Sequence, residues 1–405
     1  MDKIAEIIIK QQTLFCMNIN DIITSIKNEL IDGNFAIRQP YCNFYGDCSG
    51  AIMFLFNYSR CYNDNQAYEA ACKHVENLVE HYNSNIENIP SLSKFQWMIK
   101  YLSDNNFIEI EQYNENERST INEYLFSAQN MYFKNGLFDY LHGGLSVGLY
   151  FLINNKKEEI RKMIDDISKL SEKDHNGLKW KSVTKLRTWE DKYNLSLSHG
   201  MSSLVVMLCK IYDNAIECDK TKQMIEGAIK YILAQKLPIG QYISIYCNLA
   251  LESSETFTSS RLAWCYGDLC VAVALWRASK SLKRDDWAEE AKTILIHSSK
   301  RRDLNKNGVV DACFCHGTSG IAHIFNRMYK ETGLYDCGEA ATYWIEKTVE
   351  MSKFKDGLAG YKVWHGDNGF ENEIGLLEGI SGIGLTLLSY CSEVSMSWDE
   401  CLLLS

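Results

Sequence analysis

Proline is scarce in this chain, which has only Pro40, Pro90 and Pro238 among 405 residues. A proline ring removes a backbone hydrogen bond and clashes inside a helix, so frequent prolines would interrupt helical structure. The chain is also 46% hydrophobic, enough for a large buried core. Together these two properties favour an all-helical protein.

Clusters of basic residues are missing as well. The formal net charge is -10, and lysine and arginine form no block along the chain. Proteins that bind nucleic acid neutralise phosphates with a basic surface. The composition therefore argues against a nucleic-acid partner.

An export signal and long apolar spans are also lacking. The chain begins Met-Asp-Lys-Ile-Ala-Glu, without the basic start and apolar run of a signal peptide. The most apolar later stretches contain charged residues such as Asp139 and Glu378, which are unusual in membrane spans. Fifteen cysteines in such a chain are more often thiols or metal ligands than disulfides. We therefore expect a cytoplasmic protein without a transmembrane segment.

One short pattern recurs along the chain. It consists of a polar or aromatic residue, a glycine, two or three further residues, a small residue and an apolar run. Its first two residues are Tyr45-Gly46, His142-Gly143, His199-Gly200, Tyr266-Gly267, His316-Gly317 and Glu378-Gly379. A worn seventh copy without glycines lies at residues 93–99. Such periodicity indicates stacked supersecondary units.

The segments after and between these loops predict two kinds of helix. Apolar runs such as 203–208 and 383–388 are typical of buried helices, whereas 68–82 and 285–298 are amphipathic. About seven inner and seven outer helices would form an all-α fold, an α/α toroid, as a single domain over residues 1–405. An open helical solenoid is the alternative, although the chain has no obvious polar capping repeats. In a toroid the repeated loops would surround one cavity.

Two of the loops contain zinc-type ligands. One reads Trp264-Cys265-Tyr266-Gly267 and the other Cys313-Phe314-Cys315-His316-Gly317. Zinc prefers thiolate sulfur and imidazole nitrogen, and catalytic sites use three protein ligands with a fourth position open. Cys265, Cys315 and His316 would supply three such ligands. Cys313 is the rival ligand.

Three further residues are candidates for chemistry. His199 occupies the repeat position equivalent to the zinc loops, and its ordinary pKa suits acid–base catalysis near neutral pH, although it could be a capping or core histidine. Asp139 lies three residues before His142 and could be a helix N-cap. Arg261 lies four residues before Cys265, where it could stabilise developing negative charge or form a surface ion pair.

These residues together resemble the lanthionine synthetase C-like family, the cyclases of lanthipeptide biosynthesis, in their stand-alone form. The shared motifs run in order from about Tyr45 to the C-terminus, and they are Asp139-Tyr140-Leu141-His142-Gly143, Ser198-His199-Gly200, Trp264-Cys265-Tyr266-Gly267, Cys315-His316-Gly317-Thr318-Ser319-Gly320 and 377–385. Ser202-Ser203 and Ser146-Val147 depart from the family pattern of small residues.

The resemblance implies a fold, a site and a reaction. The fold would be an α/α toroid, with zinc on Cys265, Cys315 and His316. His199 and Asp139 would be catalytic, supported by Arg261 and Tyr266. The enzyme would add peptide cysteine thiolates to dehydrated serines and threonines, forming thioether rings. A dehydrated precursor peptide would be its substrate, and a separate dehydratase and an export transporter would be its partners.

Three other functions compete with this interpretation. A relative that binds or adds glutathione or another thiol would keep the zinc and the barrel. A toroid glycosidase would need two carboxylates, for which Asp139 and Glu378 could be offered, but the cysteine and histidine ligands would be unexplained. A non-catalytic peptide-binding scaffold would not need His199 and Asp139 beside an open metal site.

Overall fold

The computed structural model describes residues 18–31, 43–84, 89–109, 115–181, 192–238, 240–247, 249–251 and 259–405. The N-terminal residues used above to argue against an export signal lie outside this part. The chain divides into two compact units, described separately below. Unit 1 comprises Met1–Asn85, Val310–Lys330 and Gly338–Ser397, and unit 2 comprises Ile86–Val309, Glu331–Cys337 and Trp398–Ser405. The single domain over residues 1–405 stays a prediction.

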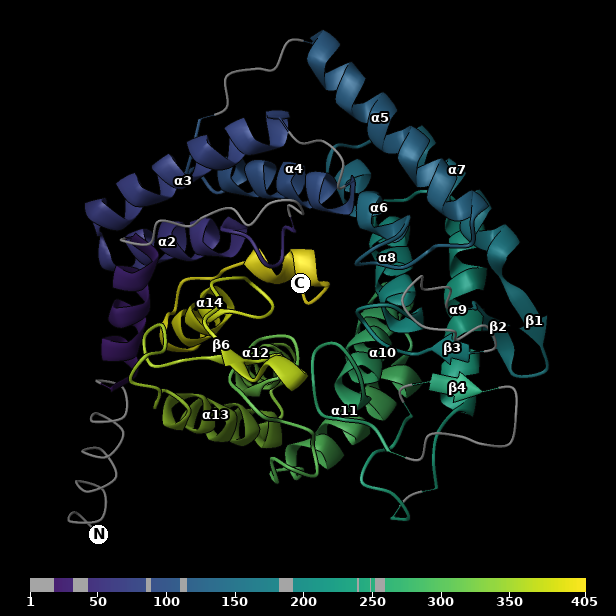
Figure 1. The fold of residues 1–405 in the computed structure, drawn as a ribbon. Helices are drawn as coiled ribbons and strands as arrows, with labels where there is room; N and C mark the ends of the chain where they lie inside the picture. The colour runs from purple at the N-terminus through teal and green to yellow at the C-terminus, as the bar shows by residue number, and fades with distance from the viewer. Residues whose placement is uncertain are drawn as a thin grey trace. The chain divides into compact units, whose positions relative to one another are not determined.

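Unit 2 is built from two kinds of helix. Buried helices are α4 (Ile89–Asp104), α6 (Leu145–Ile153), α8 (Met201–Asp213) and α10 (Asp268–Leu282). Amphipathic helices are α5 (Glu115–Lys134), α7 (Lys157–Leu170), α9 (Cys218–Ala234) and α11 (Asp285–Ser299). In α7 the buried residues recur at helical spacing, as Ile160, Met163, Ile164 and Ile167. The second set packs on the first, with α7 on α6, α9 on α8, and α11 on α10 (Figure 1).

Short strands complete unit 2. The antiparallel strands β1 (Glu172–Asp174) and β2 (Gly177–Lys179) form a hairpin, and β2 packs on α9. Strand β3 (Lys192–Asn194) pairs with β4 (Leu249–Leu251), also antiparallel, with Asn194 opposite Leu249. The β3–β4 pair leads directly into the loop that carries His199.

Unit 1 has the same organisation. It contains a helix over residues 18–31, α2 (Ser49–Tyr62), α3 (Asn65–Ser84), α14 (Ile380–Cys391) and most of α12 (Thr318–Thr332) and α13 (Tyr335–Glu350). Helix α2 packs between α3 and α14. A small ribbon of β5 (Val363–Trp364), the 3₁₀ helix η1 (Gly366–Asn368) and β6 (Phe370–Glu371) lies between α13 and α14 in the sequence.

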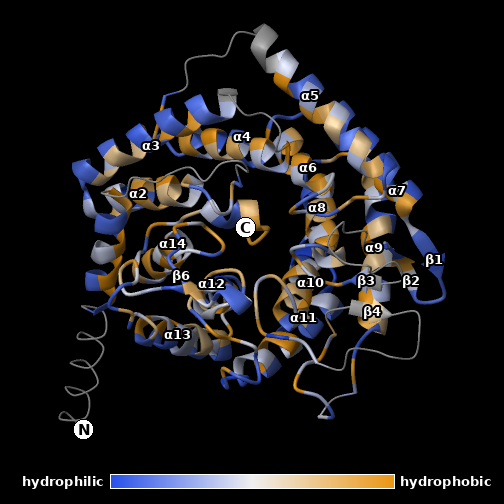
Figure 2. Cartoon of the chain, in the orientation of Figure 1, coloured by the Kyte–Doolittle hydropathy of each residue, from blue (hydrophilic) through white to orange (hydrophobic). Residues whose placement is uncertain are grey.

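The helical assignments made from the sequence are confirmed. The apolar runs 203–208 and 383–388 lie in α8 and α14 and are buried throughout. The worn seventh copy lies in α4, which is also largely buried. The amphipathic stretches 68–82 and 285–298 lie in α3 and α11. Figure 2 shows the difference: α3 and α7 carry hydrophilic faces, whereas α6 and α8 are mostly hydrophobic.

The repeated glycine has a specific steric reason in two of the loops. A Cβ atom on Gly267 would lie 2.0 Å from the carbonyl oxygen of Arg261, and one on Gly200 would lie 2.3 Å from that of Asn194. Gly267 also has φ +102°, a conformation unfavourable for residues with side chains. Each loop folds back on the backbone six residues earlier before its inner helix begins.

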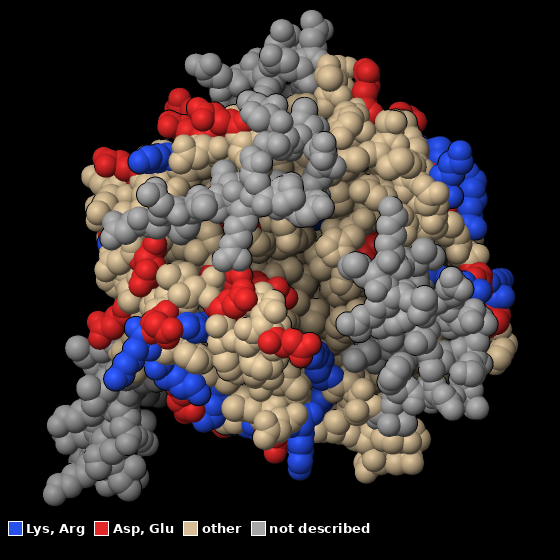
Figure 3. All heavy atoms as spheres, in the orientation of Figure 1, with Lys and Arg blue, Asp and Glu red and all other residues tan. Residues whose placement is uncertain are grey.

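The surface carries charges of both signs. On the face drawn in Figure 3, acidic and basic side chains are interspersed. Within the described part of the chain, no helix has the combined length and apolarity needed to cross a membrane.

A buried ion pair holds the start of α10, directly after the Cys265 loop. Asp268 and Arg301 are 0% and 6% exposed, and Arg301 Nη1 lies 2.9 Å from Asp268 Oδ2. The Asp268 carboxylate also accepts hydrogen bonds from the backbone of Ile245 and Tyr246. Because both charges are out of water, each depends on the other.

We expect Asp268→Ala to lower the free energy of unfolding by about 3–5 kcal/mol, because it leaves Arg301 charged and unpaired in the core. Denaturant unfolding followed by circular dichroism measures the change. The matched control is Asp286→Ala, which breaks the exposed pair with Arg284 and should cost about 1 kcal/mol or less. Equal losses in the two variants would contradict the role assigned to the buried pair.

Candidate active site and metal ligands

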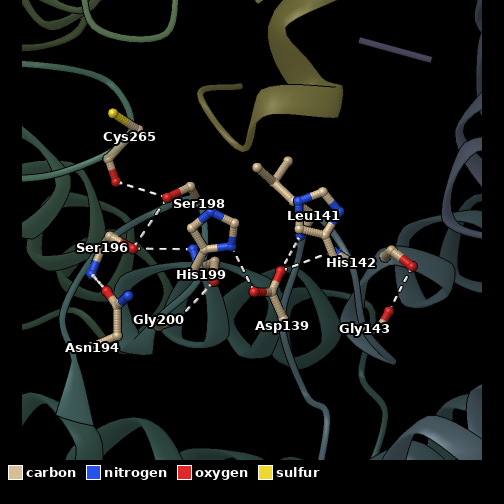
Figure 4. A network of polar contacts seen from close by, with 12 residues as sticks. Asp139, Leu141, His142, Gly143, Asn194, Ser196, Ser198, His199, Gly200 and Cys265 are labelled. Atoms are coloured by element: carbon tan, nitrogen blue, oxygen red, sulfur yellow. Dashed lines mark hydrogen bonds and ion pairs between the residues drawn. The ribbon is translucent and has the colours of Figure 1, made fainter. Parts of the chain in front are cut away.

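Three loops of unit 2 are joined by side-chain hydrogen bonds (Figure 4). His199 Nδ1 lies 2.6 Å from Asp139 Oδ2, which joins the loop before α6 to the loop before α8. The Ser198 hydroxyl donates to the carbonyl oxygen of Cys265 at 3.0 Å, which joins the α8 loop to the α10 loop. The side-chain amide of Asn194 donates to the Tyr266 hydroxyl at 3.4 Å. Four residues selected from the sequence, Asp139, His199, Cys265 and Tyr266, thus lie in one connected network.

The Asp139 carboxylate organises its own loop and the imidazole of His199. Its Oδ1 atom accepts the backbone N–H groups of Leu141 and His142 at 2.7 and 2.9 Å. Its Oδ2 atom faces His199 Nδ1. An ionised carboxylate only accepts hydrogen bonds, so Nδ1 carries the proton that it donates to Asp139. In neutral His199 the Nε2 atom is therefore the basic one. Asp139 is not the N-cap of α6, which is Gly144.

The surroundings of His199 set its protonation. Burial has the largest single effect and lowers the pKa, but the hydrogen bond and negative charge of Asp139, with a further contribution from Cys265, outweigh it. The pKa of His199 is therefore raised above its ordinary value. Its ring stacks on His142, with centroids 5.4 Å apart, and lies 6.2 Å from the Tyr266 ring. The side chain is 21% exposed, so it is not a sealed core histidine.

Tyr266 is suited to donating a hydrogen bond. Burial raises its pKa to about 12, with smaller contributions from Cys265 and Asp139, so the phenol keeps its proton at neutral pH. Its oxygen already accepts the Asn194 amide. Asn194 itself was missed by the sequence analysis. Its spacing in the sequence could have identified Asn194. It lies six residues before Gly200, just as Arg261 lies six residues before Gly267.

Arg261 lies at the start of the Cys265 loop. It is half-buried, and its side chain packs beside Gly308. A Cβ atom on Gly308 would be in van der Waals contact with it. Its guanidinium forms neither an ion pair nor a hydrogen bond with any residue that the structure describes. Among the described residues, Arg261 is therefore not the ion-paired surface arginine of the alternative interpretation. The catalytic role of Arg261 stays a prediction.

Three loops of unit 1 are also joined, here by their backbones. The N–H of Cys315 donates to the carbonyl of Leu377 at 2.9 Å, and the N–H of Leu377 donates to the carbonyl of Tyr45 at 3.2 Å. Cys315 and His316 are half-buried, whereas Glu378 is exposed and Tyr45 is buried. The polar residues of the six repeated loops thus fall into two sets of three. Unit 2 contains His142, His199 and Tyr266, and unit 1 contains Tyr45, His316 and Glu378.

Asp311 is a further polar residue that the sequence analysis missed. It is buried, and its carboxylate accepts the backbone N–H groups of Cys313 and Trp364 at 2.9 and 2.8 Å. It lies six residues before Gly317, the same spacing as Asn194 to Gly200. The possible ligand atoms of Asp311, Cys313 and His316 lie within 4.8 Å of one another. Unit 1 thus offers a ligand set of its own.

Burial distinguishes the two cysteines of this loop. Cys313 is completely buried, and burial, reinforced by the charge of Asp311, raises the pKa of its thiol well above the usual range. Cys315 remains partly exposed. Because zinc binds the thiolate form, the surroundings of Cys315 suit a ligand better than those of Cys313.

Comparison with known proteins places this arrangement in a family. A family model described as lanthionine synthetase C-like protein matches residues 42–403. The chain belongs to the lanthionine synthetase C-like family. Among solved structures, nisin cyclase matches with a TM-score of 0.73 and 18% sequence identity, covering 96% of this chain and 97% of the other. This match confirms the predicted all-α toroid as the fold class of this family member.

A second solved structure, a sugar epimerase from a ruminal bacterium, matches with a TM-score of 0.43 and 10% identity, covering 95% of this chain and 99% of the other. This likeness is too low to bear on fold or function.

We expect Asp139→Asn to lower the pKa of His199, because burial would no longer be outweighed by a neighbouring negative charge. NMR titration of the histidine ring protons measures the shift, and His199→Asn identifies the signal by its loss. Asp286→Asn, which removes an exposed carboxylate paired with Arg284 at the start of α11, is the control and should leave the titration unaltered. An unchanged His199 pKa in Asp139→Asn would refute the electrostatic coupling.

Proposed function

We propose that this family member is a zinc-dependent lanthipeptide cyclase. It would add cysteine thiolates of a dehydrated precursor peptide to dehydroalanine or dehydrobutyrine, forming lanthionine or methyllanthionine rings. The observation that carries the proposal is the Asp139–His199 pair, hydrogen-bonded at 2.6 Å beside Tyr266 and the backbone-anchored Cys265 loop. A proton-transfer pair next to a potential thiolate ligand suits the addition of a thiol to an alkene.

The donor chemistry fits zinc. We propose Cys265, Cys315 and His316 as the ligands, since two thiolates and an imidazole match the preference of this metal. Ser198 fixes the backbone of Cys265, and Leu377 fixes that of Cys315. When bound, zinc would keep a substrate thiol ionised near neutral pH, where a thiol of pKa about 8.5 is only a few per cent thiolate.

His199 is proposed to deliver the proton that completes the addition. The sulfur forms a bond to the β-carbon of the alkene, the π electrons move onto the carbonyl as an enolate, and the α-carbon then takes a proton. The raised pKa of His199 keeps part of it protonated near neutral pH, so Nε2 can donate. Asp139 holds the ring through Nδ1 and stabilises the imidazolium. The thiol proton replaces the one delivered, so the product has the mass of the substrate.

Tyr266 and Arg261 are proposed to stabilise the enolate oxygen. Tyr266 stays protonated at neutral pH because burial raises its pKa to about 12. Its oxygen accepts from Asn194, which leaves the phenolic proton to be donated. A positioned donor and a positive charge favour negative charge that develops during the reaction. Positioning of the thiolate against the alkene would supply much of the remaining acceleration.

We propose that a separate enzyme dehydrates the peptide. The sequence contains neither a Gly-x-x-x-x-Gly-Lys-Ser/Thr loop nor the kinase-type glycine loop that activation of serine and threonine by phosphorylation would use. We propose a cytoplasmic reaction on a precursor peptide that is later passed to an export transporter.

We expect purified protein to contain one zinc ion per chain, and Cys265→Ala and Cys315→Ala each to lose it. Metal analysis by mass spectrometry measures the content. Cys313→Ala is the matched control and should keep the ion. Zinc loss in Cys313→Ala with full retention in Cys265→Ala would instead support Asp311, Cys313 and His316 as ligands. Circular dichroism should show that helicity survives in every variant, because a core of this size does not depend on a metal.

We expect His199→Asn to retain zinc and to lose about 10²–10⁴-fold in ring-closure rate, the usual contribution of a general acid or base. The assay is alkylation of unreacted thiols followed by mass measurement, because each ring consumes one thiol without changing the peptide mass. Equal alkylation of a cognate dehydrated peptide with and without zinc-loaded enzyme would refute the cyclase. Glutathione with an alkene acceptor, followed by the same loss of thiol, tests the related thiol-adding function.

A further inference from the structure

The last eight residues of the chain, Trp398–Ser405, are embedded in unit 2. They comprise the 3₁₀ helix η2 (Trp398–Leu402) and three further residues. Chain ends are usually poorly ordered unless contacts hold them. Here Trp398, Leu402 and Leu403 are fully buried. Leu403 also has φ +61°, a left-handed conformation that is costly for leucine, so the surrounding contacts must stabilise it.

Side chains from three inner helices anchor this C-terminal segment. Two of them bind Glu400: Trp97 of α4 donates its indole N–H at 3.1 Å, and Lys210 of α8 lies at 3.0 Å. Arg277 of α10 donates to the carbonyl of Leu404. The segment is therefore held firmly within unit 2, and side chains that bind to it are held in place as well.

Two backbone carbonyls of the segment accept hydrogen bonds from side chains that neighbour the candidate active site in the sequence. The Tyr140 hydroxyl donates to the carbonyl of Cys401 at 2.8 Å, and the Trp264 indole N–H donates to that of Leu402 at 3.0 Å. Tyr140 directly follows Asp139, and Trp264 directly precedes Cys265. Both aromatic side chains are completely buried. The Lys94 Nζ atom lies over the Tyr140 ring, 3.7 Å from the ring centre.

We propose that the C-terminal segment positions Asp139 and Cys265 by holding Tyr140 and Trp264. The inference rests on the proposed function for the roles of those two residues. Asp139 and Cys265 lie in loops outside the regular helices. Their backbone is restricted by individual hydrogen bonds, from Gly143 N–H to the Asp139 carbonyl and from Ser198 to the Cys265 carbonyl, rather than by a continuous helical ladder. A neighbouring side chain held at its far end removes much of the remaining freedom, and catalytic geometry is sensitive to displacements of about 1 Å.

The chain offers a matched control for each positioning residue. Trp180 of unit 2 is completely buried and donates its indole N–H to the carbonyl of Ile167 in α7 at 2.8 Å. Tyr150 lies in α6, is 5% exposed and donates its hydroxyl to Asn122 at 2.7 Å. Trp264→Phe and Trp180→Phe therefore each lose one indole hydrogen bond to a backbone carbonyl, and Tyr140→Phe and Tyr150→Phe each lose one hydroxyl hydrogen bond.

We expect Tyr140→Phe and Trp264→Phe to loosen their own loops. Hydrogen exchange followed by mass spectrometry should be about fivefold faster in residues 139–144 and 261–267 respectively, as expected for one lost hydrogen bond. Trp264→Phe should also release zinc to a chelator about tenfold faster, within the range found for supporting groups around metal ligands. Ring closure should fall in kcat with little change in KM, since the peptide still binds.

The controls Trp180→Phe and Tyr150→Phe should leave loop exchange, zinc release and kcat at wild-type values, even where they lower the melting temperature. Equal effects of test and control variants, or wild-type loop exchange in both test variants, would overturn the positioning role. If Trp264→Phe fails to fold, Tyr140→Phe decides the question alone. Wild-type protein that neither binds zinc nor closes rings would refute the proposed function, while loop exchange would still decide whether the segment restrains the loops.

Discussion

The close approach of a glycine to the backbone six residues before it is the constraint on which the candidate site depends. Cβ atoms on Gly200, Gly267 and Gly317 would lie 2.3, 2.0 and 2.6 Å from the carbonyl oxygens of Asn194, Arg261 and Asp311. Only glycine allows loops this compact to enter an inner helix. The residue immediately before each glycine is thereby held at the helix entrance, where His199, Tyr266 and His316 occur.

Polar side chains in these loops have two roles at once. Asp139 satisfies backbone N–H groups of its own turn and also holds the His199 imidazole. Asn194 likewise accepts a backbone N–H from Ser196 with its oxygen and contacts Tyr266 through its nitrogen. Buried polar groups need partners, so the bonds that stabilise each loop also orient the groups proposed for chemistry. A substitution of Asp139 or Asn194 therefore changes both the stability of its loop and the orientation of the neighbouring reactive group.

The fold follows from overall structural similarity, whereas the proposed function follows from individual side chains. Structural similarity to nisin cyclase at 18% identity establishes the toroid, and one fold can host many activities. The proposed function rests on the hydrogen-bonded Asp139–His199 pair, the protonated Tyr266 and the thiol chemistry of the cysteine loops. Burial separates Cys313, whose thiol pKa is well above the usual range, from the partly exposed Cys315. That difference is what makes the ligand assignment testable by three alanine variants.

The sequence by itself determined the helical class, the repeat, and the inner and outer character of helices such as α8 and α11, because these properties depend on local composition and spacing. It also identified His199 and Asp139 as candidates, but 60 residues separate them in the chain. Only the tertiary structure decided that they share a hydrogen bond, and that Asn194 and Asp311 support the loops. It also decided that the chain end lies against Tyr140 and Trp264. Contacts between distant segments depend on how the helices pack, and no local pattern records that packing.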